Sequence, residues 1–404
     1  MIRDAALRSN SGADANSSAR KPDSWAFFGI LSPHSGAGKT LGAIAEAVRA
    51  TGQEVSFQVN SSHNLAAIFA QSRALLACRA EVVFVRYSPK LVLSIAVSAL
   101  LARVQGRVFL LHVPTPVKVG LREGRGSRSV GAVVMKNLLA RFAFPLAALA
   151  ATLVVQNGVG VSSEPRWLVR KSILASNPSV GKAAPRDDDL SEVREEHALR
   201  AFGLSANSAY HGYDRLVRGL QASEARNPSI AVRQRIHLRL AGPRTAFTHE
   251  IGLLKRRPLR MHQVEFIGTI KDSCVQAMLR DADFAVGPLG THRVGLLAGS
   301  ALRNRDFLAN LVPWVTSMPD IGMHDLNPDW IMEVAPSEAD LEPDRIGAWF
   351  SALNLREARK EMLAIHAELA PDRFVQHLEG ALSDWRSRRS TPDVWPIRPA
   401  RHVE

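Results

Sequence analysis

The first residues whose spacing suits chemistry form the segment SPHSGAGKT, residues 32–40. An apolar run, 25–31, precedes this segment and an amphipathic pattern follows it, so we expect a loop between a strand and a helix. Backbone N–H groups of small residues at the start of a helix can bind an anion. We therefore expect Gly36, Gly38 and Lys39 to approach a ligand, while a tight turn with a purely structural role stays open.

The same segment matches part of the P-loop motif G-x-x-x-x-G-K-[ST], which binds nucleoside triphosphates. Gly38, Lys39 and Thr40 fit the end of the motif, but Pro33 stands at the first glycine, whose backbone geometry proline cannot adopt. The later apolar run 82–86 ends in arginine and supplies no aspartate for magnesium. A P-loop NTPase is therefore kept as an alternative function.

Strand-length apolar runs alternate with helical patterns along the chain and position this loop. The runs are continuous, which indicates strands buried on both faces by crossover helices in a doubly wound parallel sheet. In the first half the expected strands are 25–31, 54–59, 82–86, 108–113, 152–155 and 172–175. In the second half they are 199–204, 236–241, 264–267, 284–288, 313–316 and 330–334. The sequence thus predicts an α/β fold with two doubly wound halves.

The 404 residues are enough for two domains of this kind. Residues 1–24 are small and polar, and we expect a disordered tail there. The predicted division is an N-terminal Rossmann-like domain at 25–178, a linker at 179–196, a second Rossmann-like domain at 197–354, and C-terminal helices and a tail at 355–404. Two halves whose strands end toward each other enclose a cleft, and we expect the last helices to pack back over the domain junction.

Four segments of the second half carry a resemblance to a known family: AYHGYDRLVRGL (209–220), IHLRLAG (236–242), VEFIG (264–268) and GPLGTHRVGLLAGSALRNRDFLANLVPWV (287–315). Their order and spacing resemble those of the family-4-like glycosyltransferases of the GT-B fold, and the bacterial members that build surface polysaccharides look closest. In the first half, HVPTPVKVGLRE (112–123) resembles the segment after the fourth strand of such enzymes. The resemblance implies an acceptor-side first domain and a second domain that binds a nucleotide-sugar donor.

The resemblance also implies a donor site framed by two glutamates with the spacing E-x7-E. The second position falls on Asp306, which can still accept hydrogen bonds from ribose, and the first falls on Ala298, which cannot contact the sugar in that way. A Gly-rich loop from Gly295 to Ser300, ahead of a helix at 301–310, is expected to offer N–H groups to the diphosphate. An exposed helix position without a role is the alternative for Asp306.

A diphosphate needs cations as well, and the segment SANS (205–208) lacks the arginine that the family has at this place. Arginine can bind a phosphate with two parallel N–H groups. We expect Arg244, which follows the carboxyl end of a predicted strand, to contact the donor, and Arg293 is the second choice. Arg303 and Arg215 are further candidates, and a solvated surface arginine is the alternative for each of them.

Sugar transfer requires the acceptor hydroxyl to be oriented or deprotonated. His112 and His34 are the polar candidates on the first-domain side, because histidine can serve as a base or hydrogen-bond donor near neutral pH. Residues 187–189 are three aspartates in the expected linker with no strand before them, so a solvated charge run is favoured over a metal site. We expect neither a metal nor another cofactor, since the nucleotide sugar is itself a substrate.

The chain is strongly basic, with 51 Lys and Arg, 38 Asp and Glu, and a net charge of +13. Residues 118–141 combine apolar residues with six basic ones and a single acid, a pattern typical of an interfacial helix at an anionic membrane surface. The six basic residues are Lys118, Arg122, Arg125, Arg128, Lys136 and Arg141. A core helix with a basic rim is the alternative. Aromatic residues are only 6% and no base-stacking motif occurs, so we expect no nucleic-acid partner.

The two cysteines lie far apart in apolar patterns, which favours a reducing compartment, and the first residues lack the apolar stretch of a signal peptide. Together the patterns and the resemblance predict a cytoplasmic, peripherally membrane-bound glycosyltransferase of hexosyltransferase type in polysaccharide biosynthesis. Its expected partners are a nucleotide-sugar donor and a glycan or lipid-linked acceptor. Two alternatives stay open: the P-loop NTPase, and a catalytically degenerate GT-B binding protein, suggested by Ala298 and by the missing phosphate arginine.

Overall fold

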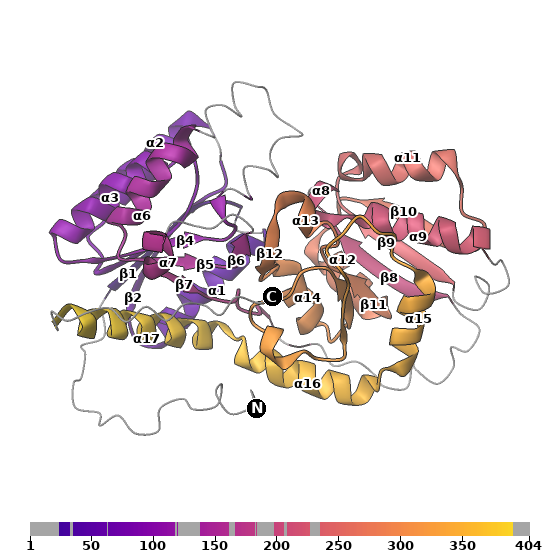
Figure 1. Cartoon of the computed structure of the whole chain (residues 1–404). Helices are drawn as coiled ribbons and strands as arrows, with labels where there is room; N and C mark the ends of the chain where they lie inside the picture. Colours follow the sequence, from indigo (N-terminus) through magenta and orange to yellow (C-terminus); the bar gives the residue numbers. More distant parts are fainter. Residues whose placement is uncertain are drawn as a thin grey trace.

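The computed structural model of the chain describes residues 24–32, 35–62, 64–117, 119, 138–160, 166–181, 183, 198–205, 208–226 and 235–390. These residues form two α/β domains side by side and two C-terminal helices that run along both (Figure 1). Residues 1–23 of the expected tail and most of the expected linker lie outside the described residues. Ser24, expected at the end of the tail, is instead the first residue of a strand.

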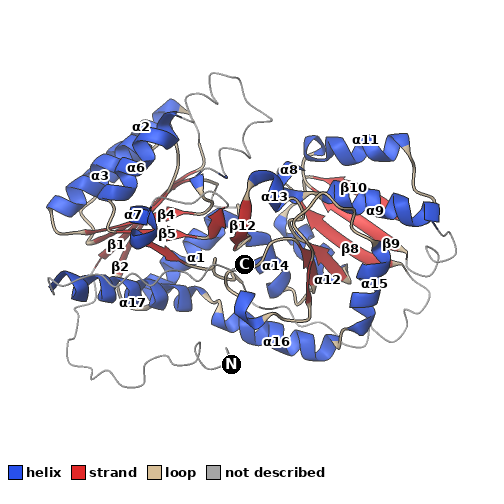
Figure 2. Ribbon diagram, in the orientation of Figure 1, coloured by secondary structure: helices blue, strands red, loops and turns tan. Residues whose placement is uncertain are grey.

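The sheet of the first domain (red strands at the left of Figure 2) has six parallel strands. Their order is β2-β1-β3-β4-β5-β7. Both ends of each strand lie within one residue of the ends predicted from the sequence. The strands are β1 (Ser24–Ile30), β2 (Glu54–Asn60), β3 (Val82–Arg86), β4 (Val108–Val113), β5 (Leu153–Gln156) and β7 (Ser172–Leu174).

Helices cover both faces of this sheet. They are α1 (Gly36–Ala50), α2 (Leu65–Ala77), α3 (Val92–Val104), the π-helical turn η2 (Leu139–Ala143), α6 (Phe144–Ala150) and α7 (Arg166–Lys171). Side chains of β1 alternate between the two faces: Trp25 and Phe27 pack with α1, whereas Ala26 and Phe28 pack with α2, α3 and α6. Burial of both faces is the reason why the predicted strands read as continuous apolar runs.

The second domain repeats this plan. Its parallel sheet has the order β10-β9-β8-β11-β13-β14. Its strands, each within two residues of the prediction, are β8 (Leu199–Leu204), β9 (Ile236–Ala241), β10 (Gln263–Gly268), β11 (Phe284–Val286), β13 (Trp314–Thr316) and β14 (Ile331–Glu333). Its helices are α8 (Ser208–His211), α9 (Tyr213–Arg226), η4 (Arg244–Phe247), α11 (Thr248–Arg256), α12 (Asp272–Asp281), α13 (Thr291–Val294), α14 (Leu302–Ala309), η5 (His324–Leu326) and α15 (Pro343–Ala352).

The C-terminal helices connect the two domains. Helix α16 (Leu355–Glu368) packs Met362 and Ile365 into the core of the second domain beside α14. Helix α17 (Pro371–Ser390) then returns to the first domain, where Phe374 and Leu378 join the core against α1 (Figure 1). The predicted fold class, two Rossmann-like domains with the last helices packed back over the junction, is therefore confirmed.

A two-stranded antiparallel ladder joins the domains, which the sequence did not predict. Strand β6 (Gly158–Gly160) of the first domain pairs with β12 (Leu296–Gly299) of the second. The expectation of a phosphate-binding loop between Gly295 and Ser300 was wrong at this point. Gly295 ends α13 with φ 73°, and the Ser300 N–H donates to the Asn157 carbonyl oxygen at 2.8 Å. A strand whose partner lies in another domain gives no local periodic signal.

A buried cluster of polar side chains reinforces this ladder. Arg305 forms an ion pair with Asp320 at 2.6 Å and donates to the Asn177 carbonyl oxygen at 2.7 Å. The Asn177 N–H donates to Ser300 Oγ at 2.8 Å. Because Asn177 follows the last strand of the first sheet, these contacts fix the second domain directly against the first.

The packing of α9 gives a test of the second-domain core. A Cβ at Gly219 would overlap the backbone carbonyl of Leu341, which cannot rotate away as a side chain could. Gly219→Ala should lower the free energy of unfolding by about 1–3 kcal/mol, measured by urea denaturation. The matched control is Gly252→Ala in α11, where nothing lies within 4 Å; it should stabilise the protein by roughly 0.5–1 kcal/mol because alanine favours helix. Equal stabilities of the two variants would contradict this packing.

Candidate functional site

A cleft of about 570 Å³ lies between the two domains. Its walls are built where strands end: Arg86 ends β3, Leu204 ends β8 and Ala241 ends β9. Residues just after the strands complete the lining, among them Pro114, Thr115, Asn157, Gly158, Ser205, Gly242, Pro243, Thr269 and Ile270. Ligands of doubly wound sheets bind outside the carboxyl ends of the strands, so this cleft is the candidate functional site.

Arg303, one of the candidates from the sequence, brings a positive charge into the cleft from the first turn of α14. Its guanidinium donates to the Leu204 carbonyl oxygen and to His211 Nδ1, the latter at 2.6 Å, and lies 5.9 Å from the centre of the Tyr210 ring. None of these partners carries a charge: Leu204 contributes a carbonyl oxygen, Tyr210 a ring, and the His211 imidazole is neutral. Burial, and then the charge of Arg303, hold the pKa of His211 well below its ordinary value. Arg303 is therefore held in place with its charge available for an anion.

Asp306 lies one turn further along α14, is partly buried, and is not among the residues that line the cleft. Within the described residues its carboxylate has no hydrogen bond and no ion pair. Burial raises the pKa of Asp306 to about 6, and the charges of Lys39 and Arg303 act against this shift. A carboxylate with free lone pairs near two cations can accept hydrogen bonds from the hydroxyl groups of a ligand.

The start of α1 contacts the second domain, and none of the described residues of the segment 32–40 lines the cleft. Lys39 Nζ forms an ion pair with the Asp272 carboxylate at the start of α12. Gly36 opens α1, which contacts α14, and the Gly38 N–H donates to Ser35 Oγ at 3.1 Å as part of the helix cap. His34, a candidate from the sequence, lies outside the described residues.

His112 lies beneath the cleft and is only 2% exposed. Its Nε2 is hydrogen bonded to Asn157 Oδ1, and its Nδ1 has no partner in the described part of the chain. Burial, and then the charge of Arg86, lower the pKa of His112 to about 3, so the ring is neutral near pH 7. The geometry favours a role in positioning Asn157, which lines the cleft, over the expected role as a base.

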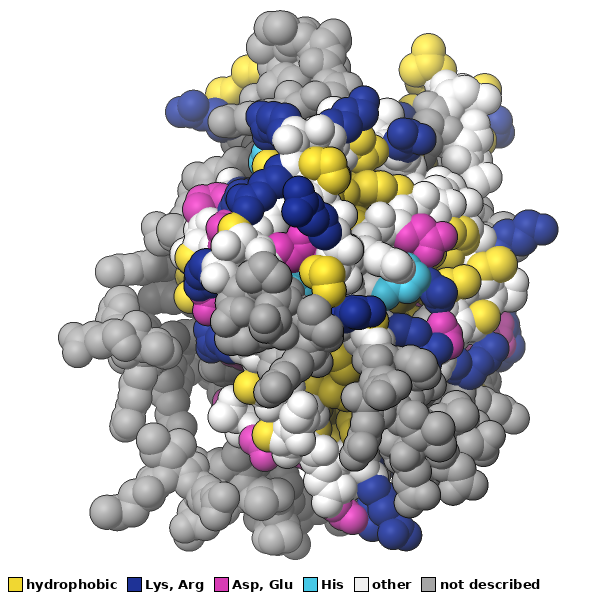
Figure 3. All heavy atoms as spheres, turned by 90° about the vertical axis from the view of Figure 1, so that its right-hand side faces the viewer, with side chains coloured by type: hydrophobic (Ala, Val, Ile, Leu, Met, Phe, Trp, Pro, Cys, Tyr) yellow, Lys and Arg dark blue, Asp and Glu magenta, His cyan; other side chains and the backbone are white. Residues whose placement is uncertain are grey.

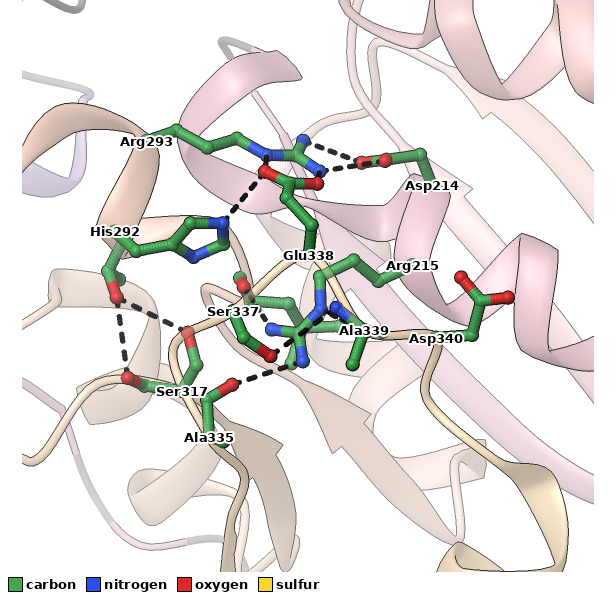
Figure 4. A network of polar contacts seen from close by, with 12 residues as sticks. Asp214, Arg215, His292, Arg293, Ser317, Ala335, Ser337, Glu338, Ala339 and Asp340 are labelled. Atoms are coloured by element: carbon green, nitrogen blue, oxygen red, sulfur yellow. Dashed lines mark hydrogen bonds and ion pairs between the residues drawn. The ribbon is translucent and has the colours of Figure 1, made fainter.

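Arg293 lies in an ion network of the second domain (Figure 4) and is not among the residues that line the cleft. Its guanidinium forms two hydrogen bonds of 2.8 Å with Asp214, and it binds the Glu338 carboxylate at 2.7 and 2.5 Å. The hydrogen bonds from Arg293 lower the pKa of Glu338 to about 2. Two carboxylates balance the charge of Arg293, so this structure does not place it to bind a diphosphate.

The two remaining arginine candidates differ in exposure. Arg215 is buried and donates to three carbonyl oxygens, those of Leu289, Ala335 and Ala339, which gives it a structural role (Figure 4). Arg244 is exposed in η4, directly after Pro243 of the cleft lining. Arg244 therefore lies at the rim of the cleft. Ser300, a further candidate, lines the cleft as Arg303 does, and its Oγ accepts a hydrogen bond from Arg305 at 2.7 Å.

Sequence reasoning did not single out Arg86, Asn157, Tyr210 and His211 as site residues, although all four line the cleft. A usable signal existed for Asn157, because Asn-Gly marks a turn and follows a buried strand. Among the residues that the structure describes, no group of three His, Cys, Asp or Glu side chains could hold a metal ion. The expectation of a reaction without a cofactor stays a prediction.

No protein-family model matches the chain, and a search of curated proteins finds no match either. Solved structures match over nearly its whole length. The apo structure of OtsA is 12% identical with a TM-score of 0.57 and covers 92% of this chain and 100% of its own. The UDP-forming α,α-trehalose-phosphate synthase from Burkholderia vietnamiensis is 12% identical with a TM-score of 0.56, covering 93% and 100%.

The catalytic domain of starch synthase IV from Arabidopsis thaliana, bound to ADP and acarbose, is 9% identical with a TM-score of 0.56, covering 91% of this chain and 99% of its own. The chain has the GT-B fold. At these identities the likeness concerns the fold.

The raised pKa of Asp306 predicts a dependence of stability on pH. Because the folded protein holds this proton more tightly than the unfolded chain does, stability is lost as the pH rises from about 4 through 6. At pH 7–8, Asp306→Asn, which cannot ionise, should therefore have a free energy of unfolding higher than that of the wild type by on the order of 2 kcal/mol, seen as a higher melting temperature. Below pH 4 the two proteins should be equally stable. Asp384→Asn on the exposed side of α17 is the control. A difference that does not change with pH would contradict the burial of Asp306.

Proposed function

We propose that this protein is a glycosyltransferase of hexosyltransferase type. It would transfer a sugar from a nucleotide-sugar donor to a glycan or lipid-linked acceptor in polysaccharide biosynthesis, at the cytoplasmic face of a membrane. The observation that carries the proposal is the charge of the GT-B cleft: among the described lining residues, the two charged side chains are both arginines, Arg86 and Arg303. A nucleotide sugar is anionic through its diphosphate and so matches this lining. Proteins of the same fold support the kind of ligand, since one is named UDP-forming and another was solved with ADP.

The donor fits the wall that the second domain provides. Arg303 can bind the diphosphate at the start of α14, where the helix dipole adds positive potential, and its contacts with His211 and Tyr210 keep it in place. Asp306, with its free lone pairs, can accept hydrogen bonds from the ribose. Arg244 at the rim remains a further contact for the phosphates or the sugar.

The P-loop NTPase gains no specific observation, and the degenerate binding protein keeps the one on which it rests. For the P-loop NTPase, Lys39 would have to leave Asp272 to reach a triphosphate, and β3 ends in Arg86 where a magnesium ligand would be needed. For the degenerate binding protein, Ala298 stands in β12 opposite Val159, so this position supplies no carboxylate to the cleft. A radiometric transfer assay with a panel of donors separates binding from catalysis.

Nucleotide binding should depend on Asp306 and Arg303 but not on Lys39. A ligand that binds only the folded state at a hundred times its dissociation constant adds about 2.7 kcal/mol, so thermal stabilisation can screen UDP, GDP, ADP and ATP. For the diphosphate that binds, Asp306→Ala should weaken affinity by roughly 1.5–3 kcal/mol, the value of a hydrogen bond to a charged group. Arg303→Gln should weaken it comparably, and Lys39→Ala should leave it unchanged.

The outcomes separate the functions. Unchanged diphosphate affinity in a folded Asp306→Ala variant removes this residue from the site. Loss of ATP binding in Lys39→Ala, with diphosphate binding intact in Arg303→Gln, would favour the NTPase instead.

A large apolar surface on the first domain supports the membrane part of the proposal. The neighbouring helices α2, α3 and α6, which lie side by side on the outer side of the first sheet, carry twelve exposed large apolar side chains together with the turn before α6 (Figure 1). Exposure reaches 71% at Phe69 and 78% at Val104. We name this surface the apolar face. Its members are Leu65, Phe69, Leu76, Leu93, Val97, Leu100, Leu101, Val104, Leu138, Phe142, Leu146 and Leu149.

The charges of the apolar face indicate what it contacts. Helices α2, α3, η2 and α6 contain no Asp or Glu, whereas Arg73, Arg103 and Arg141 are exposed on them. The surface at the outer end of the second domain differs from the apolar face in its charges, because Asp and Glu side chains lie between the Lys and Arg there (Figure 3). A second copy of the chain would bring like charges together, whereas an anionic lipid surface complements both the apolar and the basic side chains. The basic segment 118–141, predicted to be interfacial, lies almost wholly outside the described residues.

Binding to the membrane should be peripheral, since among the described residues no helix has the length and apolar character needed to cross a bilayer. Leu93, Val97, Leu100 and Val104 follow one side of α3 at the spacing i, i+4, i+7 and i+11. Changing all four to serine should reduce co-sedimentation with anionic vesicles at least tenfold, because each buried apolar side chain contributes about 1.5–3 kcal/mol. Binding should also fall at high salt.

The matched control is the pair Leu326→Ser and Leu363→Ser, two exposed leucines of the second domain outside the apolar face. This control should bind vesicles as the wild type does. Equal partitioning of the wild type to neutral and anionic vesicles, or full binding by the α3 variant, would remove the membrane from the proposal.

A further inference from the structure

Arg86 is the second arginine of the cleft, and its place differs from that of Arg303. It is the last residue of β3, near the middle of the first sheet, and lines the cleft from the first domain. Within the described residues, the guanidinium of Arg86 has no hydrogen bond and no ion pair. Burial lowers its pKa to about 10, so Arg86 still carries its charge near neutral pH.

The polar groups around Arg86 are neutral or already occupied. His112 lies opposite Arg86 on β4 and is held neutral, with Nε2 bonded to Asn157. The Asn157 amide has partners as well: its Oδ1 is hydrogen bonded to His112, and its Nδ2 donates to the Ala175 carbonyl oxygen at 2.6 Å. Thr115, from the loop after β4, lines the same side of the cleft and has no hydrogen-bond partner for its hydroxyl among the described residues.

An unneutralised guanidinium in a partly buried position destabilises the protein unless an anion joins it. No carboxylate of the described residues lines the cleft to supply that charge. The cleft thus has two separate cationic positions on opposite walls, and a donor whose diphosphate lies at Arg303 leaves Arg86 for a second anionic group. The first domain faces the acceptor in the proposed function, so that group belongs to the acceptor.

We propose that Arg86 binds an oxyanion of the acceptor, a phosphate or a carboxylate, and that the acceptor is therefore an anionic molecule rather than a neutral glycan. This inference rests on the proposed function, since it takes Arg303 for the donor. The planar guanidinium can bind such a group with two parallel N–H donors, and the Thr115 hydroxyl can donate a further hydrogen bond. The same chemistry is offered by a soluble sugar phosphate or uronate and by a lipid phosphate.

The test is a calorimetric titration at constant ionic strength. The probes are glucose 6-phosphate and glucuronate against glucose, and farnesyl phosphate against farnesol in neutral detergent. The wild-type protein should bind at least one oxyanion probe at least tenfold more tightly than the neutral counterpart of that probe. This preference should hold both without nucleotide and with a saturating nucleoside diphosphate. Arg86→Gln should lose this preference, and Arg86→Lys should keep part of it because the charge remains.

Three controls make the result specific. Arg79→Gln removes the same charge from an exposed position ahead of β3 and should bind like the wild type. Arg303→Gln should keep the oxyanion preference while losing nucleoside diphosphate affinity. The melting temperature of Arg86→Gln without ligand should equal or exceed that of the wild type, because the variant removes an uncompensated charge.

The outcomes distinguish this inference from the function on which it rests. Binding of no oxyanion probe by the wild type, or an unchanged oxyanion preference in folded Arg86→Gln, overturns the inference even if nucleoside diphosphates bind. Failure of every nucleoside diphosphate to bind overturns the proposed function, and the titrations without nucleotide still report on Arg86. A preference for farnesyl phosphate alone would assign the oxyanion to a lipid, and a preference for the soluble probes would assign it to a free sugar.

Discussion

The domain junction is the constraint on which the rest of the structure depends. The β6–β12 ladder and the bond from Ser300 to the Asn157 backbone hold the two sheets with their carboxyl ends facing each other. The buried ion pair of Arg305 with Asp320 adds directional contacts to the first domain through Asn177. Removing one partner would leave a buried charge unpaired, so the cluster favours one arrangement strongly. The cleft, with an arginine on each wall, exists because this arrangement is fixed.

The arginines of the two domains differ in their partners according to where they lie. Outside the cleft, Arg293 is balanced by Asp214 and Glu338, and these pairs serve the fold. Inside the cleft, Arg303 is held by neutral partners and Arg86 by none among the described residues. Buried cations without counter-ions are costly, and such groups cluster where ligands bind. This contrast, rather than the overall charge of the chain, indicates an anionic ligand.

The sequence predicted the sheets well, because burial on both faces leaves continuous apolar runs such as that of β4. It missed β12, since the pairing partner of that strand belongs to the other domain. Of the site, Arg303 and Ser300 were found through the family resemblance and do line the cleft. The sequence alone could not show that Arg303 and not Arg293 lines the cleft, because only the fold reveals which arginine pairs with a carboxylate. His112 was noticed for its residue type, but its burial depends on the packing of the sheet.

The central claim is that an anionic donor binds the second-domain wall of this cleft. The most direct measurement is a crystal structure of the protein with the nucleoside diphosphate that stabilises it most. The account predicts phosphate oxygens within hydrogen-bond distance of Arg303 and a ribose hydroxyl on the Asp306 carboxylate. A nucleotide bound instead to the loop at 35–40, with its phosphates on Lys39, would contradict the account.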